Sequence, residues 1–345
     1  MSIPTTRRAL VLTPETKSVT LRSLPIPELK PGEVLVKVKA IALNPIDSLY
    51  VEHPIAEQER VIGTDFAGDV VAAADDLASN PDSRTKPGTR VSGFLQGGRH
   101  DSTDTADPSL LRQLQDGRLH GVSCDPVGPG VGLDRQGLSL PFSPQPTDTA
   151  GKTYVIYGAS TSLAMYAAQL ARALDPAVTL IGVASKGKHD FLRREFGYDY
   201  LFDYRDNDWA EQIAALGPVD YAFDAITEGD STKSLDRILA DDGKLVVFRF
   251  PKGEFKHEPV YGAAALQIPA DPKKREFATK FYEWLSETHA LKANPIRRMP
   301  GGLEKVTEDG FVLLGPQWVS ERANIDRKED YMKPISGEKL VYTIS

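Results

Sequence analysis

Residues 154–170 read YVIYGASTSLAMYAAQL. The first four are aromatic or β-branched and apolar, as in a strand buried inside a parallel sheet. A turn of small residues follows, and an alanine-rich run with helical spacing comes directly after it. This order of strand, tight turn and helix predicts the opening of a βαβ unit of the kind that binds dinucleotides.

The turn has the small side chains that allow a backbone to approach a pyrophosphate. Gly158 holds the first glycine position of the dinucleotide pattern, Ser160 stands where the second is usual, and Ala164 lies near the third. An ordinary βα turn would have the same composition, so the surrounding sequence has to decide. If the turn binds phosphate, backbone N–H groups and hydroxyls would contact it from Ala159, Ser160, Thr161 and Ser162.

The end of the next predicted strand, 178–183, bears on the choice of cofactor. An NAD-specific site places an acidic residue there, roughly 20 residues beyond the glycine turn, to bind the ribose hydroxyls. This chain instead has Ser185, Lys186, Gly187 and Lys188. A hydroxyl and two cations suit a 2′-phosphate, so we predict NADP(H); a solvated basic turn is the alternative interpretation.

Three further runs, 200–204, 219–226 and 244–249, are predicted to be strands of the same sheet. In an open α/β sheet the ligand lies beyond the carboxyl ends of the strands. We therefore expect Ile226, Phe248 and Arg249 to approach the nicotinamide half of the cofactor.

Composition excludes several classes of protein. The 345 residues suffice for two domains, and a net charge of −7 argues against binding nucleic acid or anionic membranes. No apolar run approaches the ~20 residues that span a bilayer, and the N-terminus lacks a signal-peptide core. Cys124 is the single cysteine and the six histidines are scattered, which excludes a multi-thiolate zinc site. A cytoplasmic protein is expected.

The N-terminal part is rich in predicted strands. Residues 33–40, EVLVKVKA, alternate apolar and charged side chains, and NPID (44–47), GTDFAG (63–68) and KPGTRVSGF (86–94) follow. This order resembles the medium-chain dehydrogenase/reductase superfamily, which joins a GroES-like β-rich catalytic domain to a Rossmann domain with a doubly wound parallel sheet. The resemblance implies an α/β protein with a GroES-like domain over 1–125, an NADP-binding Rossmann domain over 145–265, and a return to the catalytic domain over 266–345.

The resemblance is closer to the zinc-independent branch. Zinc-dependent members carry Cys in the NPID region and a His-Glu pair in the GTDFAG region, whereas this chain has Asn44-Pro45 and Thr64-Asp65. Without a soft ligand a catalytic zinc is not expected. With NPIRRMPGGLE at 294–304 and SGEKLVYTI at 336–344, the pattern looks most like the trans-acting enoyl reductases of fungal polyketide clusters.

The resemblance also implies site residues. Cofactor contacts are expected in the NPID helix start, after the third Rossmann strand and in the closing strand, at Pro45, Ile46, Asp47, Ser48, Tyr204, Val341 and Tyr342. Substrate contacts are expected at Tyr261, Gly262, Ala263, Ala264 and Ala265. No proton donor can be named. Tyr50 is a candidate polar group for the catalytic step, and a turn-surface side chain is the alternative.

Residues 101–136 depart from the family. Relatives build a wall of the substrate pocket there, but this stretch is rich in Gly and Pro and has no sustained period. Either the gene model carries an error here or this member has a truly altered pocket.

The sequence therefore predicts NADPH-dependent reduction of the C=C bond of an α,β-unsaturated polyketide thioester, in trans with a polyketide synthase. A stand-alone quinone or enone reductase and a catalytically silent NADP-binding protein are the alternatives. The expected substrate is a small molecule or a carrier-bound acyl group. Relatives occur as monomers and homodimers, and the sequence does not choose between them.

Overall fold

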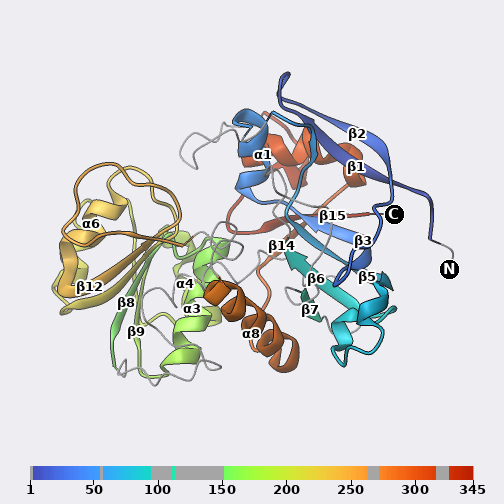
Figure 1. Cartoon of the computed structure of the whole chain (residues 1–345). Helices are drawn as coiled ribbons and strands as arrows, with labels where there is room; N and C mark the ends of the chain where they lie inside the picture. Colours follow the sequence, from blue (N-terminus) through green and yellow to red (C-terminus); the bar gives the residue numbers. More distant parts are fainter. Residues whose placement is uncertain are drawn as a thin grey trace. The chain divides into compact units, whose positions relative to one another are not determined.

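A computed structural model of the chain describes residues 3–54, 57–94, 111–113, 151–262, 272–315 and 326–344. The chain divides into two compact units, Met1–Asp125 with Tyr282–Ser345, and Pro126–Phe281 (Figure 1). The boundaries predicted above, between 125 and 145 and between 265 and 266, fall outside the described residues. They remain predictions.

The second unit is built on a parallel sheet of six strands. These are β8 (Thr153–Tyr157), β9 (Thr179–Val183), β10 (Tyr200–Phe202), β11 (Val219–Asp224), β12 (Leu239–Val247) and β13 (Val260–Tyr261). Their order across the sheet is β10-β9-β8-β11-β12-β13, and all neighbours are parallel. Numbered along the chain, this is the 3-2-1-4-5-6 order of dinucleotide-binding folds, so the predicted Rossmann sheet is confirmed. The strand order reverses between β8 and β11.

Helices connect these strands: α3 (Ser162–Leu174), α4 (His189–Phe196), α5 (Trp209–Ala214) and α6 (Ser231–Ile238). A short 3₁₀ turn, η5 (Lys186–Lys188), precedes α4. Thr161 caps α3, and α4 ends at Gly197, whose φ of +66° is a left-handed conformation that glycine adopts without steric cost. Residues next to the helices, such as Thr161 and Gly197, therefore determine where α3 begins and where α4 ends.

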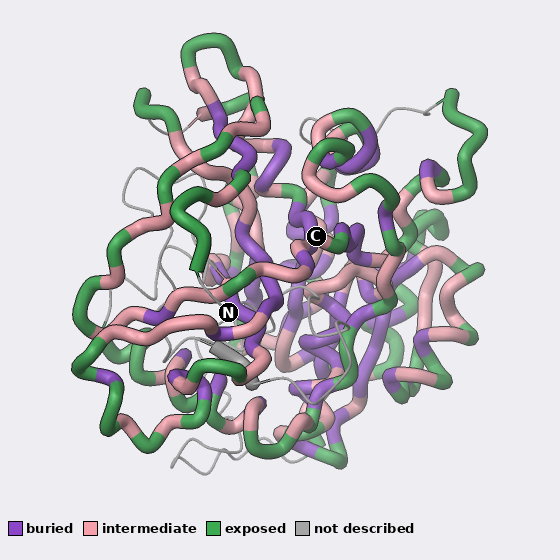
Figure 2. Tube along the Cα trace, turned by 90° about the vertical axis from the view of Figure 1, so that its right-hand side faces the viewer, coloured by how far each residue is buried: buried purple, intermediate pink, exposed green. Residues whose placement is uncertain are grey.

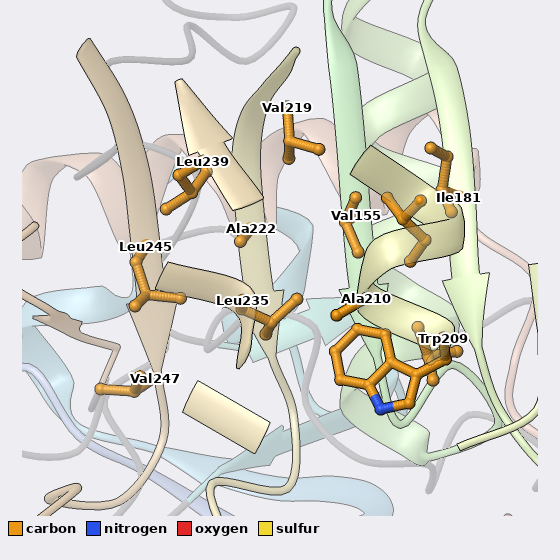
Figure 3. Close-up of a cluster of buried hydrophobic side chains, with 12 residues drawn as sticks. Val155, Ile181, Trp209, Ala210, Val219, Ala222, Leu235, Leu239, Leu245 and Val247 are labelled. Atoms are coloured by element: carbon orange, nitrogen blue, oxygen red, sulfur yellow. The ribbon is translucent and has the colours of Figure 1, made fainter. Parts of the chain in front are cut away.

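The core of this unit lies between one face of the sheet and the helices that cover it. Val155 on β8 and Ile181 on β9 are fully buried, and Trp209 and Ala210 of α5 pack on them (Figure 3). Leu235 of α6 lies in the same cluster. Burial of such apolar surface is the main stabilising contribution to a fold of this kind.

The first unit contains two sheets. A three-stranded sheet has the order β2 (Ser18–Pro25), β1 (Thr6–Thr13), β4 (Arg60–Val61). A six-stranded sheet has the order β14 (Ile296–Met299), β15 (Lys339–Thr343), β3 (Val34–Ala42), β5 (Asp65–Ala73), β6 (Arg90–Phe94), β7 (Leu111–Gln113). Among the described strands of this sheet, β14 and β15 are the one parallel pair. Within the atypical stretch 101–136, only 111–113 are described.

Short helices complete this unit. They are α1 (Pro45–Glu52), three 3₁₀ turns in the N-terminal and C-terminal parts, η1 (Asp75–Leu77), η2 (Ser83–Thr85) and η9 (Asp330–Met332), and the run η6 (Gly302–Lys305), η7 (Val306–Gly310) and α9 (Phe311–Leu314). Apolar residues at roughly helical spacing predict a helix over 277–288. Helix α8 spans Pro272–Thr288 and so begins five residues earlier than predicted. The fixed φ of proline suits the first position of a helix, which explains the earlier start.

The last strand joins the N-terminal half of the chain. Strand β15 pairs antiparallel with β3, with Tyr342 opposite Ile41. Tyr342 is fully buried and packs in a cluster that includes Leu10 and Leu43. In Figure 2 buried segments of the chain, in purple, alternate with exposed segments in green. No helix in the described part of the chain is long and apolar enough to cross a membrane.

Truncating a core side chain of the parallel sheet should destabilise the second unit. Ile181 is 0% exposed, and Ile181→Ala removes three carbon atoms from the close-packed cluster. We expect a loss of about 2–5 kcal/mol in the free energy of unfolding, measured by urea denaturation. Leu216→Ala, at a side chain that is 46% exposed, is the control and should change it by about 0.5 kcal/mol or less. Equal losses in the two variants would contradict the central position of β9.

Candidate functional site

The first site feature is the turn after β8. Gly158 has φ +72°, and its N–H and that of Ala159 donate to the Val183 carbonyl at 2.9 and 3.0 Å, which holds the turn against the end of β9. A Cβ on Gly158 would lie 2.6 Å from Cγ1 of Ile226, in the loop after β11. Glycine therefore allows the two loops on either side of the strand-order reversal to approach each other.

The start of α3 has the properties of a phosphate site. Oγ1 of Thr161 accepts from N of Ala164 at 3.3 Å, and the Thr161 N–H donates to the Gly158 carbonyl at 2.8 Å. Ala159 is fully buried, while Ser160, Thr161 and Ser162 are half-buried. The helix N-terminus thus lies beside a turn of small side chains at the carboxyl edge of the sheet, which fits a pyrophosphate. The four predicted contact residues come together, and their contact with cofactor stays a prediction.

The segments after β9 and β10 are joined by Asp203. Its Oδ2 accepts from N of Lys186 and its Oδ1 from N of Arg205, both at 3.0 Å. The Arg205 guanidinium lies 4.5 Å above the ring of Tyr204 and donates to Asp203 Oδ1 at 3.3 Å. Sequence reasoning missed Arg205, because a single cation after a strand forms no pattern of its own.

Asp203 is an acidic group near a predicted phosphate site, so its protonation state affects whether an anion could bind there. Burial alone would raise the pKa of Asp203, but the N–H groups of Arg205 and Lys186 and the Arg205 charge lower it below its usual value. The carboxylate is ionised and its oxygens are already occupied by donors. Lys186, Lys188 and Arg205 outnumber it, so the local charge still suits an anion.

Asp224, fully buried at the end of β11, organises the loop that follows. Its Oδ1 accepts from N of Ile226 and Thr227 at 3.1 and 2.8 Å. Its Oδ2 accepts from the hydroxyls of Ser231 and Thr232 at 2.7 and 2.8 Å. Burial raises the pKa of Asp224 while these donors oppose the shift. No sequence pattern singled out this carboxylate, although its partners follow within eight residues.

Thr227 connects this loop to the next strand. It has φ +54°, and its hydroxyl accepts from N of Phe248 at 3.3 Å. The Phe248 ring lies 4.8 Å from that of Phe223, and Nη2 of Arg249 lies 3.6 Å from Oε1 of Glu228. Residues predicted to face the nicotinamide half are therefore clustered beyond the carboxyl ends of β11 and β12.

The predicted substrate residues are partly described. The Tyr261 ring lies 4.3 Å from the exposed ring of Phe250. The Gly262 N–H donates to the Val247 carbonyl at 2.9 Å, and a Cβ there would lie 2.9 Å from the Phe248 ring. Gly262 therefore lies against Phe248, and Tyr261 pairs with Val247 at the edge of the sheet. Ala263, Ala264 and Ala265 lie outside the described residues.

The predicted contact segment of the first unit is the start of α1. Oδ2 of Asp47 accepts from N of Asn44 at 2.8 Å, and the Ser48 hydroxyl donates to the Gly315 carbonyl at 2.9 Å. Both side chains are buried and bonded within this unit. Pro45 is exposed, and Ile46 and Tyr50 are half-buried. Cofactor contact by these residues, and a catalytic role for Tyr50, stay predictions.

The closing strand brings a lysine to this segment. Lys339 is 4% exposed, and its Nζ donates to Asn44 Oδ1 at 2.5 Å and lies 3.3 Å from Asp65 Oδ2. Nδ2 of Asn44 donates to the Thr64 hydroxyl at 2.7 Å. We call Asn44, Asp47, Thr64, Asp65 and Lys339 the buried charge cluster.

The buried charge cluster holds two carboxyl groups and one ammonium group. Burial, reinforced by the neighbouring charge of Asp65, raises the pKa of Asp47 to about 7, although the Asn44 N–H and Lys339 act in the opposite direction. Burial also raises the pKa of Asp65, against the effect of Lys339. Asp47 is therefore partly protonated near pH 7.

Val341 and Tyr342 follow Lys339 on β15. Both are buried, and the Tyr342 hydroxyl donates to the Lys305 carbonyl at 3.2 Å. Their predicted cofactor contact is untested. Among the residues that the structure describes, no group of three or more His, Cys, Asp or Glu side chains is arranged to hold a metal ion.

This combination of a dinucleotide-type sheet and a β-rich unit with a GroES-like domain defines a class of oxidoreductases that use a nicotinamide cofactor. The alcohol dehydrogenase GroES-like domain profile matches residues 30–122, and the zinc-binding dehydrogenase profile matches residues 163–266. The chain is 31% identical to trans-enoyl reductase ACTTS2 of Alternaria alternata, over 98% of this chain and 99% of that protein. The protein belongs to the medium-chain dehydrogenase/reductase family.

Further comparisons agree on the fold. Trans-enoyl reductase RAP2 of Pyricularia oryzae is 27% identical over the whole of both chains. The crystal structure of the CurK enoyl reductase matches with a TM-score of 0.72 at 18% identity, over 98% of this chain and 99% of that chain. The mycobacterial protein Rv1454c, solved with NADPH, matches with a TM-score of 0.70 at 18% identity, over 98% of this chain and 100% of that one.

Gly158 should tolerate alanine poorly for two separable reasons. Gly151 has a similar φ, +74°, but a Cβ there would meet nothing within 4 Å. Gly151→Ala therefore tests backbone strain alone, which costs about 1–3 kcal/mol, while Gly158→Ala adds the contact with Ile226. We expect Gly158→Ala to lower the free energy of unfolding more, and Ile226→Ala in the same chain to recover part of the difference. Equal effects at the two glycines would contradict the close approach of the two loops.

The raised pKa of Asp47 should appear in the pH dependence of stability. The folded state retains a proton that the unfolded chain, with the ordinary pKa of 3.8, has lost. This contribution is fully present below about pH 4 and is lost as pH rises toward about 7. Asp47→Asn should flatten that fall in the free energy of unfolding, measured by urea titrations across this range. Asp190→Asn, at a side chain 97% exposed, should keep the wild-type slope, and an unchanged slope in Asp47→Asn would contradict the assignment.

Proposed function

We propose that the protein reduces the C=C bond of an α,β-unsaturated ketide thioester with NADPH, acting in trans with a polyketide synthase. The observation that carries this proposal is the full-length similarity to a protein named as a trans-enoyl reductase, at 31% identity. The similarity extends over both units and is therefore not limited to the cofactor-binding fold.

The preference for NADPH rests on the two segments joined by Asp203. The Arg205 guanidinium lies over the exposed ring of Tyr204. Lys186 and Lys188 belong to the turn η5, which Asp203 joins to this segment by accepting from the Lys186 N–H. The one acidic group among them is already bonded to backbone N–H groups. Cations in this position favour a 2′-phosphate.

The chemistry divides between the cofactor and the chain. When bound, the nicotinamide cofactor supplies a hydride to the β-carbon of the substrate. The turn at 158–162 would hold its pyrophosphate, and the loops that carry Ile226 and Phe248 would orient its nicotinamide half. The reaction places negative charge on the thioester oxygen, so N–H or O–H donors close to that oxygen lower the barrier. A proton then completes the product at the α-carbon.

The proposal is tested by NADPH consumption with the purified protein. Substrates are a panel of 2-enoyl thioesters, including a crotonyl thioester, and a panel of small quinones. Turnover of the thioesters is expected. Reduction of quinones alone would favour a stand-alone quinone reductase, and NADPH binding without any turnover would favour a silent binding protein.

Removing a cation from the predicted 2′-phosphate site should weaken NADPH binding selectively. For Lys186→Ala and Lys188→Ala we expect Kd for NADPH to rise by roughly 10-fold or more, because a charge-assisted hydrogen bond contributes about 1.5–3 kcal/mol. Kd for NADH, which lacks the phosphate, should stay unchanged. Isothermal titration measures both. Lys233→Ala, an exposed lysine on α6, is the control, and equal losses for NADPH and NADH would overturn the assignment.

A further inference from the structure

Lys339 is a buried cation whose side chain contacts two distant parts of the first unit. It begins β15, its partner Asn44 immediately precedes α1, and Asp65 begins β5. Its Nζ lies 2.5 Å from Asn44 Oδ1 and 3.3 Å from Asp65 Oδ2. The side chains of Lys339 and Asp65 are each 4% exposed. One ammonium group therefore links segments that are up to 295 residues apart.

The position of this cation is energetically unfavourable for α1 itself. A helix N-terminus carries partial positive charge, so a cation next to it is repelled. Removing an ammonium group from water is also costly, and an apolar replacement of a buried ion pair is often at least as stable. Asp65 and Asp47 offset the charge. Stability alone is thus a poor explanation for a lysine at this place.

The geometry around Asn44 indicates what the lysine does. Oδ1 of Asn44 accepts from Lys339, which orients the amide so that Nδ2 donates to the hydroxyl of Thr64. That hydroxyl lies 3.4 Å from Oδ1 of Asp47, and Oδ2 of Asp47 accepts from N of Asn44. The buried charge cluster therefore holds the first turn of α1 at two positions, at Asn44 before the helix and at Asp47 within it.

Lys339 itself is held in place by the neighbouring segment. The Lys339 N–H donates to the Pro295 carbonyl at 2.9 Å. Nη2 of Arg297 donates to Oε1 of Glu338 and to the Pro334 carbonyl, both at 3.1 Å. These hydrogen bonds hold the backbone at the start of β15 and therefore fix the position from which the Lys339 side chain extends.

We propose that Lys339 is a positioning residue of the reductase: through Asn44 it sets the conformation of residues 45–48, the segment predicted to contact the cofactor. What that segment contacts rests on the proposed function. The positioning itself depends only on the contacts of the buried charge cluster.

The test compares three variants of the full-length protein. Lys339→Met leaves both carboxyl groups without their cation. Lys339→Met with Asp65→Asn removes the cation and the carboxylate it faces, which restores the charge balance. Lys333→Met removes a lysine whose side chain is 68% exposed in the same C-terminal region. The measurements are urea denaturation, hydrogen exchange of the peptide covering 44–52, and kcat with a crotonyl thioester and NADPH.

Lys339→Met alone should lower the unfolding midpoint, and the double variant should recover most of that loss. In the double variant we still expect amides of 44–52 to exchange about 10-fold faster or more than wild type. We expect kcat to fall by roughly 10-fold or more because misplacement of a positioning segment slows the chemical step. The Lys333→Met variant should match wild type in all three measurements.

Two results separate this inference from the proposed function. Wild-type exchange and wild-type kcat in the double variant would overturn the inference, because Lys339 would then only offset the charge of Asp65. If the wild-type protein reduces no thioester, the proposed function fails. The exchange rates of 44–52 in the double variant would still decide whether Lys339 positions this segment.

Discussion

The organisation of the second unit depends on the close approach of two loops where the strand order reverses. Gly158 can take φ +72°, and its missing Cβ leaves room for Ile226. Any larger residue would have to displace that side chain or strain the turn. Because β8 and β11 are neighbours in the sheet, the loops after them meet at the same edge. The turn at 158–162 and the loop that Asp224 organises therefore lie next to each other at that edge.

The first unit depends on a different kind of interaction. Its last strand is held by apolar packing around Tyr342 and by the ammonium group of Lys339, which faces Asn44 and Asp65. Apolar packing is non-directional, whereas a buried ion pair and its hydrogen bonds require one geometry. The buried charge cluster therefore specifies how the first turn of α1 is oriented, in addition to closing the sheet. Burial, with the charge of Asp65 beside it, raises the pKa of Asp47 to about 7, so this segment carries a carboxyl group that titrates near neutral pH.

Features that depend on residues close together in the sequence were predicted, and features that depend on contacts between distant residues were not. The strands predicted at 154–157 and 178–183 follow from short-range patterns, and the structure has β8 and β9 there. The start of α8 at Pro272 differs from the predicted 277, because a proline at the first helical position extends the helix without an apolar signal. Arg205 and Asp224 were missed because a single charged residue after a strand has no pattern of its own.

By itself the sequence determined the class of fold, the position of the dinucleotide-type turn and the family, because each is carried by consecutive residues with a definite spacing. Only the tertiary structure decided that Asp203 joins the two cationic segments, that Ile226 meets Gly158, and that Lys339 faces Asn44 and Asp65. Those contacts join residues separated by 17 to 295 positions. Side-chain identity limits which partners are chemically suitable, but the sheet order determines which of them come within hydrogen-bond distance.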